Sequence, residues 1–166
     1  MADQGRDGKR VQNLSNDPHA EMRHVLAARP NLLDGYRAFY QSFWLDEHVP
    51  HRVLALCRQR MAYIHDRACH TPIAGLESWL SETDLEQLRA GQLDGFTVAE
   101  RTALAVTETM PFSHHDVSDA QVDALTQQFG AAGCVSLLAA IAFFDVMSRL
   151  KIVWALPVAS PELIPE

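Results

Sequence analysis

Helix-start signals recur along the second half of the chain, and they constrain the fold more than any other feature of the sequence. Ser81-Glu-Thr-Asp84 and Thr97-Val-Ala-Glu100 have the form of a capping box, in which two side chains accept each other's backbone N–H groups. Ser118 precedes a further helical run, DAQVDALTQQF. No segment shows the sustained alternation of β-branched residues that is typical of a strand. The sequence therefore predicts an all-α protein.

Apolar residues three or four apart predict further helices in the first half of the chain. We expect Pro30 to end a short helix over residues 19–28, and Asn31 to cap the next one. Pro50 is expected in the first turn of a long third helix that continues past Ala68 toward Pro72. In all, about seven helices are predicted, beginning near residues 19, 31, 50, 81, 97, 118 and 131.

The length and the apolar content predict one helical domain. The chain has 166 residues, of which 48% are hydrophobic, enough for one sizeable core. Residues 1–17 offer almost nothing apolar to bury, so we expect a flexible N-terminal arm before a single domain over 18–166. The longest apolar run, 131–147, is just short of the roughly 18–20 apolar residues of a membrane-spanning helix and contains Asp145. It predicts a helix buried on all sides in a soluble bundle.

Charge and cysteine content exclude several classes of protein. A formal net charge of -7 argues against a nucleic-acid binder, which needs a basic surface. Cys57, Cys69 and Cys134 form no C-x-x-C pair, which argues against a disulfide scaffold, a zinc ribbon and a dithiol redox centre. Cys57 and Cys134 lie on apolar faces and are interpreted as small core residues. The N-terminus is polar and has no secretory signal, so we expect a reduced, cytoplasmic protein.

The densest chemistry of the sequence lies in residues 63–70, YIHDRACH. On a helix, the spacing of four residues would place His65 beside Cys69 and Asp66 beside His70. A carboxylate beside an imidazole fixes its tautomer and favours its protonated form, which suits proton transfer. A histidine beside a thiol can take its proton, but the C-terminal end of a helix disfavours the thiolate. The spacing therefore favours acid–base chemistry at His70 over nucleophilic chemistry at Cys69.

Simpler interpretations of these residues also exist. An Asp and a His four apart on a helix often form a solvated pair worth roughly a few tenths of a kcal/mol. A metal site is the weaker interpretation. The potential ligands are His65, Asp66, Cys69 and His70. Adjacent helical residues point about 100° apart, so at most two of these four side chains could share an ion. We therefore expect neither a metal nor a cofactor. Asp145 and Arg149, four apart in an apolar helix, predict an intrahelical ion pair with a structural role.

Six segments occur in an order that resembles a known family. They are LLDGYRAFYQSF, HRVLALCRQRMAYIHDRACH, GLESWLSETDLEQL, FTVAERTALAVTETM, VSDAQVDALTQQFG and FFDVMSRLKIVWALP. From about Asn31 to Pro157, the chain resembles the carboxymuconolactone decarboxylase family, which includes alkylhydroperoxidases of the AhpD type. The resemblance implies an AhpD-like helical bundle that oligomerises through helix packing as a dimer, trimer or hexamer. It also implies that His70 matches the active-site histidine of the family.

The chain departs from the peroxidase branch of that family at several positions. Two cysteines of that branch lie seven and four residues before the histidine, where this chain has Tyr63 and Asp66. The upstream glutamate of the same relay would fall near His51–Val53, where no acid is present. In the decarboxylase-like branch, a glutamate commonly lies four residues before the histidine. Asp66 is a shorter version of that acid, so the resemblance to this branch is better.

The first functional hypothesis is acid–base chemistry on a small organic acid or lactone, of the decarboxylase-like kind. His70 would donate or accept the proton, and Asp66 would orient it. Arg67 or Arg58 would anchor a substrate carboxylate, with Tyr63 as a further substrate-binding residue.

Two alternatives stay open. The chain could be a peroxidase-related antioxidant protein that uses Cys69 as a single peroxidatic cysteine, activated by His65 or His70. It could also be a non-catalytic helical oligomer that binds or scaffolds. The expected partners are a small-molecule substrate and further copies of the chain, with no nucleic acid and no membrane.

Overall fold

A computed structural model of the chain describes residues 22–45, 47–66, 73 and 75–156. Within these ranges the chain is 78% helical and contains no strand, so the prediction of an all-α fold is confirmed. The predicted arm over residues 1–17 lies outside the described part. The elements are α1 (Met22–Leu26), α2 (Pro30–Leu45), α3 (His51–His65), α4 (Glu82–Ala90), α5 (Val98–Ser113), the 3₁₀ turn η2 (His114–Asp116) and α6 (Asp119–Val153). The described residues thus form six α-helices, whereas about seven were predicted. The difference arises because α6 includes both of the helices that were predicted to begin near residues 118 and 131.

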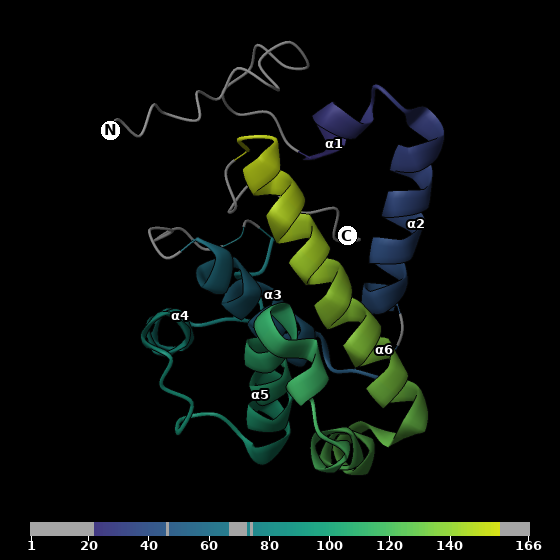
Figure 1. Cartoon of the computed structure of the whole chain (residues 1–166). Coiled ribbons are helices and arrows are strands. Elements are labelled where there is room, and N and C mark those ends of the chain that lie inside the picture. Colours follow the sequence, from purple (N-terminus) through teal and green to yellow (C-terminus); the bar gives the residue numbers. More distant parts are fainter. Residues whose placement is uncertain (1–21, 46, 67–72, 74, 157–166) are drawn as a thin grey trace, which may run out of the picture.

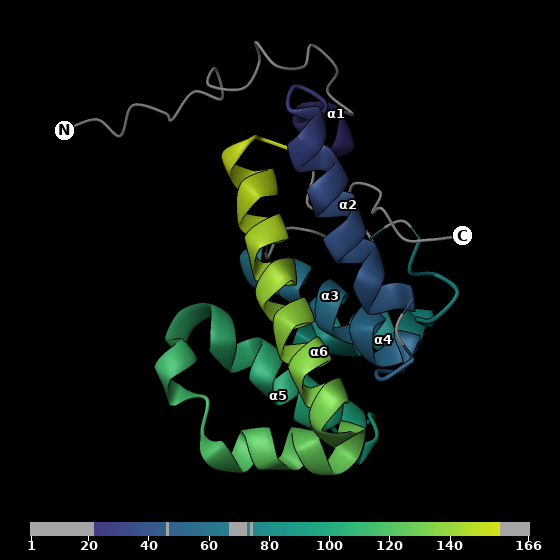
Figure 2. The ribbon, with the colours of Figure 1, turned by 90° about the vertical axis from the view of Figure 1, so that its right-hand side faces the viewer.

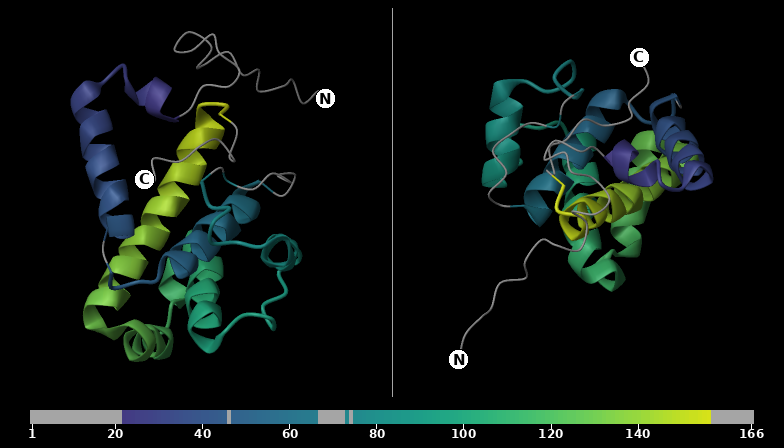
Figure 3. Two further views of the ribbon diagram at one scale, coloured as in Figure 1. Left: turned by 180° about the vertical axis from the view of Figure 1, so that it is seen from behind. Right: turned by 90° about the horizontal axis from the view of Figure 1, so that it is seen from above.

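Helix α3 lies at the centre of the bundle and contacts α2, α4, α5 and α6. The part of α6 that follows Gly130 runs diagonally through the molecule, with α2 on one side and with α4 and α5 on the other (Figure 1). The view from behind and the view from above agree with this arrangement (Figure 3). Ten of the fifteen residues of α3 are buried, which explains why this helix can bring polar side chains from several elements together.

Helix α2 packs against α6 through aromatic rings. Tyr40 and Phe43 are buried, and their ring centroids lie 6.3 and 6.5 Å from that of Phe144 on α6. The helix begins at Pro30, one residue before the cap predicted at Asn31. A proline suits this position because the first turn of a helix needs no intrahelical N–H donor. The predicted cap was therefore wrong, because the carbonyl of Arg29, two residues before Asn31, accepts the first helical hydrogen bonds, and the preceding helix already ends at Leu26.

The three predicted helix starts are confirmed. Reciprocal capping boxes begin α4 at Ser81, α5 at Thr97 and α6 at Ser118. Gly91 ends α4 in the left-handed conformation, with φ 69° and ψ 24°, as expected for a C-terminal glycine. These signals were readable because a capping box depends only on residues three apart in the sequence.

Gly130 breaks α6 into two arms that point in different directions (Figure 2). Its φ of 71° and ψ of 173° lie in a region that is essentially open only to glycine. The predicted stop at Gly130 therefore corresponds to a sharp break, from which the chain continues directly into a second helical arm.

The second arm of α6 is buried on one side only. Leu137, Ile141 and Phe144 have no exposed surface, whereas Val135 and Val153 are 69% and 67% exposed. The prediction of a helix buried on all sides was therefore wrong. By length and composition alone, α6 would also meet the requirements of a membrane-crossing helix, which is weak evidence because core helices of soluble proteins can meet them too.

Candidate functional site

Helix α3 ends at His65, earlier than predicted. Asp66 has a φ of -129° and a ψ of 89°, so the backbone leaves the helical conformation there. The predicted continuation of the helix past Ala68 is wrong at this point, consistent with the tendency of aspartate to hydrogen bond outside helix interiors. Helical spacing therefore no longer supports the pairing of Asp66 with His70 or of His65 with Cys69.

Three of the predicted site residues lie outside the described part of the chain. These are Arg67, Cys69 and His70, and their roles stay predictions. Four predicted site residues are described: Arg58, Tyr63, His65 and Asp66. They lie on the last two turns of α3 and at its end.

His65 pairs with Asp145 of α6, 80 residues further along the chain. His65 Nε2 lies 2.6 Å from Asp145 Oδ1, and the two side chains are only 10% and 20% exposed. Arg149 Nε donates to both oxygens of Asp145, at 2.9 and 3.0 Å, which confirms the predicted intrahelical ion pair. A second guanidinium nitrogen of Arg149 donates to the Pro111 carbonyl of α5 at 2.8 Å. Side chains and backbone from three helices therefore form one cluster.

This geometry is suited to proton transfer. An ionised carboxylate only accepts hydrogen bonds, so the contact with Asp145 places the proton of a neutral His65 ring on Nε2. The other ring nitrogen, Nδ1, is then the acceptor. Arg149 holds the carboxylate by both oxygens and so fixes the plane of the group that orients the ring. A histidine held in one tautomer by a carboxylate is a common arrangement of general acid–base catalysis.

Arg58 and Tyr63 occupy different environments on the same helix. Arg58 has no exposed surface, donates to Ser148 Oγ at 3.1 Å and lies 5.8 Å from the Phe144 ring centroid. Its described contacts are those of a core residue, and its role as a substrate anchor stays a prediction. Tyr63 lines a pocket of about 430 Å³ between α3, the end of α4 and α5.

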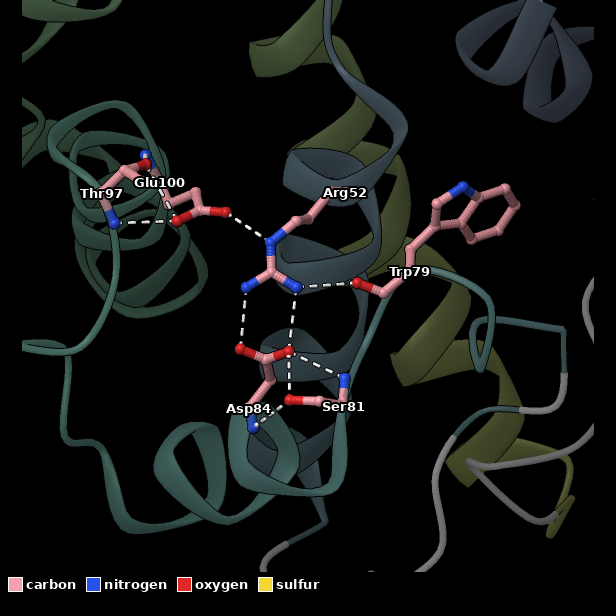
Figure 4. A network of polar contacts seen from close by, with 6 residues as sticks. All are labelled: Arg52, Trp79, Ser81, Asp84, Thr97 and Glu100. Atoms are coloured by element: carbon pink, nitrogen blue, oxygen red, sulfur yellow. Dashed lines mark hydrogen bonds and ion pairs between the residues drawn. The ribbon is translucent and has the colours of Figure 1, made fainter.

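A second polar cluster, which the sequence analysis missed, surrounds Arg52 at the opposite end of α3 (Figure 4). Arg52 donates to both oxygens of Asp84 at 2.8 and 2.9 Å, to Glu100 at 2.7 Å and to the Trp79 carbonyl at 2.8 Å. Asp84 and Glu100 are also the capping-box acids of α4 and α5. One guanidinium therefore joins the starts of three helices.

The Arg52 cluster stabilises the charged forms of its members. Hydrogen bonds from Arg52 lower the pKa of Asp84 well below its usual range, against the opposing effect of burial. Burial acts to raise the pKa of Glu100, but hydrogen bonds from Thr97 and Arg52 outweigh it, so the net shift of that pKa is downward. The pKa of Arg52 is raised, mainly by its hydrogen bond to Asp84. This arrangement indicates a structural clamp.

The described cysteines are buried, and the described acids, histidines and cysteines form no group that could bind a metal ion. Cys57 and Cys134 are both buried free thiols, which confirms the interpretation of them as core residues. Burial raises the pKa of the Cys57 thiol to about 12, so it is not a thiolate near neutral pH. Among the described residues, no group of three or more His, Cys, Asp or Glu side chains could hold a metal ion.

Comparisons with protein-family models, curated proteins and solved structures find no match to the chain. The resemblance to the carboxymuconolactone decarboxylase family therefore stays a prediction that rests on the order of the six sequence segments.

Proposed function

We propose that the protein is an acid–base enzyme of the carboxymuconolactone decarboxylase-like kind that acts on a small organic acid or lactone. The observation that carries this proposal is the 2.6 Å contact between His65 Nε2 and Asp145 Oδ1. Arg149, on the same helix as Asp145, donates to both oxygens of that carboxylate and so fixes the orientation of the group that contacts the ring. The substrate class comes from the family resemblance.

In this proposal, the end of α3 supplies the proton-transfer groups. His65 exchanges a proton with the substrate through Nδ1, and Asp145 is the positioning residue that holds the ring. His70 keeps its predicted role as a second proton donor or acceptor, and Arg67 its role as an anchor for a substrate carboxylate. A rearrangement of such a substrate needs one group to remove a proton and one to return it. Decarboxylation of a carboxylate needs only a proton donor for the carbanion that remains after CO₂ leaves. In this proposal, His65 and His70 supply these groups.

The proposal can be tested without a known substrate. A panel of small lactones and the corresponding acids is incubated with the protein in D₂O, and turnover or exchange of carbon-bound protons is followed by NMR. We expect wild-type protein to act on at least one compound, and we expect His65→Asn and His70→Ala to reduce that rate at least 100-fold. His24→Asn, at an exposed position on α1, is the control and should keep the full rate. No activity of the wild type on the panel, or full activity of both site variants, would overturn the proposal.

The peroxidase-related alternative depends on Cys69. Its activating base would be His65, through Nδ1, or His70. Because Cys57 and Cys134 are buried, a thiol reagent applied to the native protein should separate them from a reactive Cys69. Selective sulfenic acid at Cys69 after a stoichiometric peroxide pulse would support the alternative. Cys69→Ser should abolish peroxidase activity and leave acid–base turnover intact.

We also propose that the protein is a cytoplasmic homo-oligomer in which a second copy covers the exposed face of α6. Val135, Val146 and Val153 are 69%, 46% and 67% exposed, and their spacings of 11 and 7 residues place them on one side of the helix. Exposed apolar residues on one side of a helix support this proposal, because contiguous apolar surface is typical of interaction sites. Val146→Glu should convert the oligomer measured by light scattering into a monomer, whereas Ala38→Glu on exposed α2 should not. A wild-type monomer, or flotation of the wild type with lipid vesicles, would overturn this proposal.

A further inference from the structure

The pocket beside Tyr63 carries an inference that does not depend on the proposed catalysis. Its volume of about 430 Å³ is in the range of sites for small molecules. Three elements that lie far apart in the sequence meet there: the third and fourth turns of α3, the C-terminal end of α4, and the second half of α5. The lining residues are Arg60, Tyr63, Ile64, Arg89, Ala90, Gly91, Glu108 and Phe112.

Two guanidinium groups line this pocket. Arg60 donates through Nε and Nη2 to Glu108 Oε1, at 2.9 and 2.8 Å, and through Nη1 to the Leu88 carbonyl at the end of α4. A guanidinium has five N–H groups, so these contacts with described residues leave two N–H groups of Arg60 for a further acceptor. The guanidinium of Arg89 lies over the Tyr63 ring, 5.4 Å from its centroid. Both cations are therefore held in place by contacts with the protein.

The pocket also contains groups with unused hydrogen-bonding capacity. Tyr63 is only 4% exposed, and its hydroxyl has no hydrogen-bond partner among the described residues. Both contacts of Glu108 with Arg60 use Oε1, and its side chain is 35% exposed, so Oε2 could accept a hydrogen bond from a ligand. Phe112, 70% exposed, adds an aromatic wall.

The charges of the lining select among anions. Arg60 and Arg89 contribute two positive charges and Glu108 one negative charge, so the lining carries a net charge of +1. A single carboxylate matches this charge, and arginine binds planar carboxylates through paired N–H donors. A phosphate or a dicarboxylate would bring a second negative charge close to Glu108.

We propose that this pocket binds a small aromatic monocarboxylate that also carries a hydroxyl group. The carboxylate meets Arg60 and Arg89, the hydroxyl donates to Glu108, and the ring packs against Phe112. The pocket and the histidine cluster use neighbouring residues, since Ile64 precedes His65 and Phe112 follows Pro111. Binding in this pocket nevertheless needs no proton transfer at His65.

The experiment uses the full chain and 4-hydroxybenzoate as the probe, with binding measured by calorimetry and by backbone amide NMR. We expect saturable binding at millimolar concentration or below, with shifts centred on the amides of Ile64, Ala90 and Gly91. Benzoate, which lacks the hydroxyl, should bind several-fold more weakly. 4-Hydroxybenzyl alcohol, which lacks the carboxylate, and phenyl phosphate, a dianion, should each bind at least 10-fold more weakly.

Substitutions of the lining residues test which side chains contact the probe. Arg89→Gln should weaken 4-hydroxybenzoate binding at least 10-fold, whereas Arg37→Gln on exposed α2 should leave it unchanged. Glu108→Gln should improve the binding of phenyl phosphate. His65→Asn should bind the probe as wild type does, which separates this proposal from the catalytic one. Absence of saturable binding, equal binding of the alcohol, or unchanged binding by Arg89→Gln would overturn the proposal.

Discussion

The two ends of α3 each hold a side chain that reaches acids on distant elements, but they use those acids in different ways. At the N-terminal end, Arg52 contacts Asp84 and Glu100, and each of these acids also caps the start of its own helix. At the C-terminal end, His65 contacts Asp145, which is held by Arg149. The first cluster joins helices that must stay together. The second orients a ring that can gain and lose a proton.

The difference lies in what each cluster leaves available. All four carboxylate oxygens of Asp84 and Glu100 accept hydrogen bonds from Arg52 or from a helix cap. In the second region, the described contacts leave His65 Nδ1 as a proton acceptor, and the hydroxyl of Tyr63, a residue that lines the nearby pocket, has no partner among the described residues. A cluster whose carboxylate oxygens all accept hydrogen bonds is typical of a structural clamp. A cluster that keeps unused hydrogen-bonding groups beside a pocket is typical of a binding or catalytic site.

The largest effect is expected at the histidine cluster. Asp145→Asn should reduce turnover about 100- to 10,000-fold, because the amide can hold His65 in the wrong tautomer. The free energy of unfolding should change by only about 1 kcal/mol. The ¹⁵N chemical shifts of the His65 ring report the tautomer directly and would change with the rate. A normal rate with an altered tautomer would show that the cluster is structural, like the one at Arg52.

The next largest effect is expected on stability at the other end of the helix. Arg52→Met should lower the free energy of unfolding by about 2–4 kcal/mol, because it leaves two largely buried carboxylates without their cation. Urea denaturation measures this loss, and Arg37→Met, on the exposed face of α2, is the matched control. A loss below about 0.5 kcal/mol would mean that the Arg52 cluster contributes no more than a surface ion pair.

Acid should remove part of the stability that Arg52 provides. The pKa values of Asp84 and Glu100 are lower in the folded protein than their ordinary values of 3.8 and 4.5. Their contribution is therefore fully present above about pH 5 and is lost as the pH falls through the folded values. The stability difference between wild type and Arg52→Met, measured by urea denaturation from pH 7 to pH 3, should shrink below pH 4.5. A constant difference would contradict the assignment.

The smallest effect compares two helix caps. Thr97→Ala should cost about 1–2 kcal/mol, because Thr97 caps α5 and its hydroxyl also supports Glu100 within the Arg52 cluster. Ser118→Ala removes a similar cap from α6 that is exposed and has no link to that cluster, and should cost about 0.5–1 kcal/mol. Thermal denaturation of the two variants measures the difference between their losses of stability. Equal losses would show that the cluster adds nothing to the cap of α5.

The sequence predicted features whose causes are local. The capping boxes, the left-handed Gly91 and the Asp145–Arg149 pair each depend on residues within four positions of one another. The end of α3 was misplaced because the apolar spacing continues to Ala68, while the backbone leaves the helix at Asp66.

The pairs that define the two clusters have no local signature. His65 and Asp145 are 80 residues apart, and Arg52 lies 32 and 48 residues from its acids. Periodicity shows which face of a helix is buried, but not which residue of another helix will lie opposite a given polar side chain. The sequence did contain one clue, an aspartate within the long apolar segment 131–147. A charge at such a position needs a partner, but its identity depends on how α3 and α6 cross.

The break at Gly130 has a consequence for the order in which the molecule assembles. The chain before it, from α5 into the first arm of α6, is contiguous in sequence and needs only short loops to close. The arm after it must return to α3, and the contact between His65 and Asp145 closes a loop of 80 residues. Contacts of such separation form late, because their loop-closure entropy must be met before they contribute stability. We therefore expect the proton-transfer geometry to be among the last features of the fold to form, so that only completely folded chains are competent for chemistry.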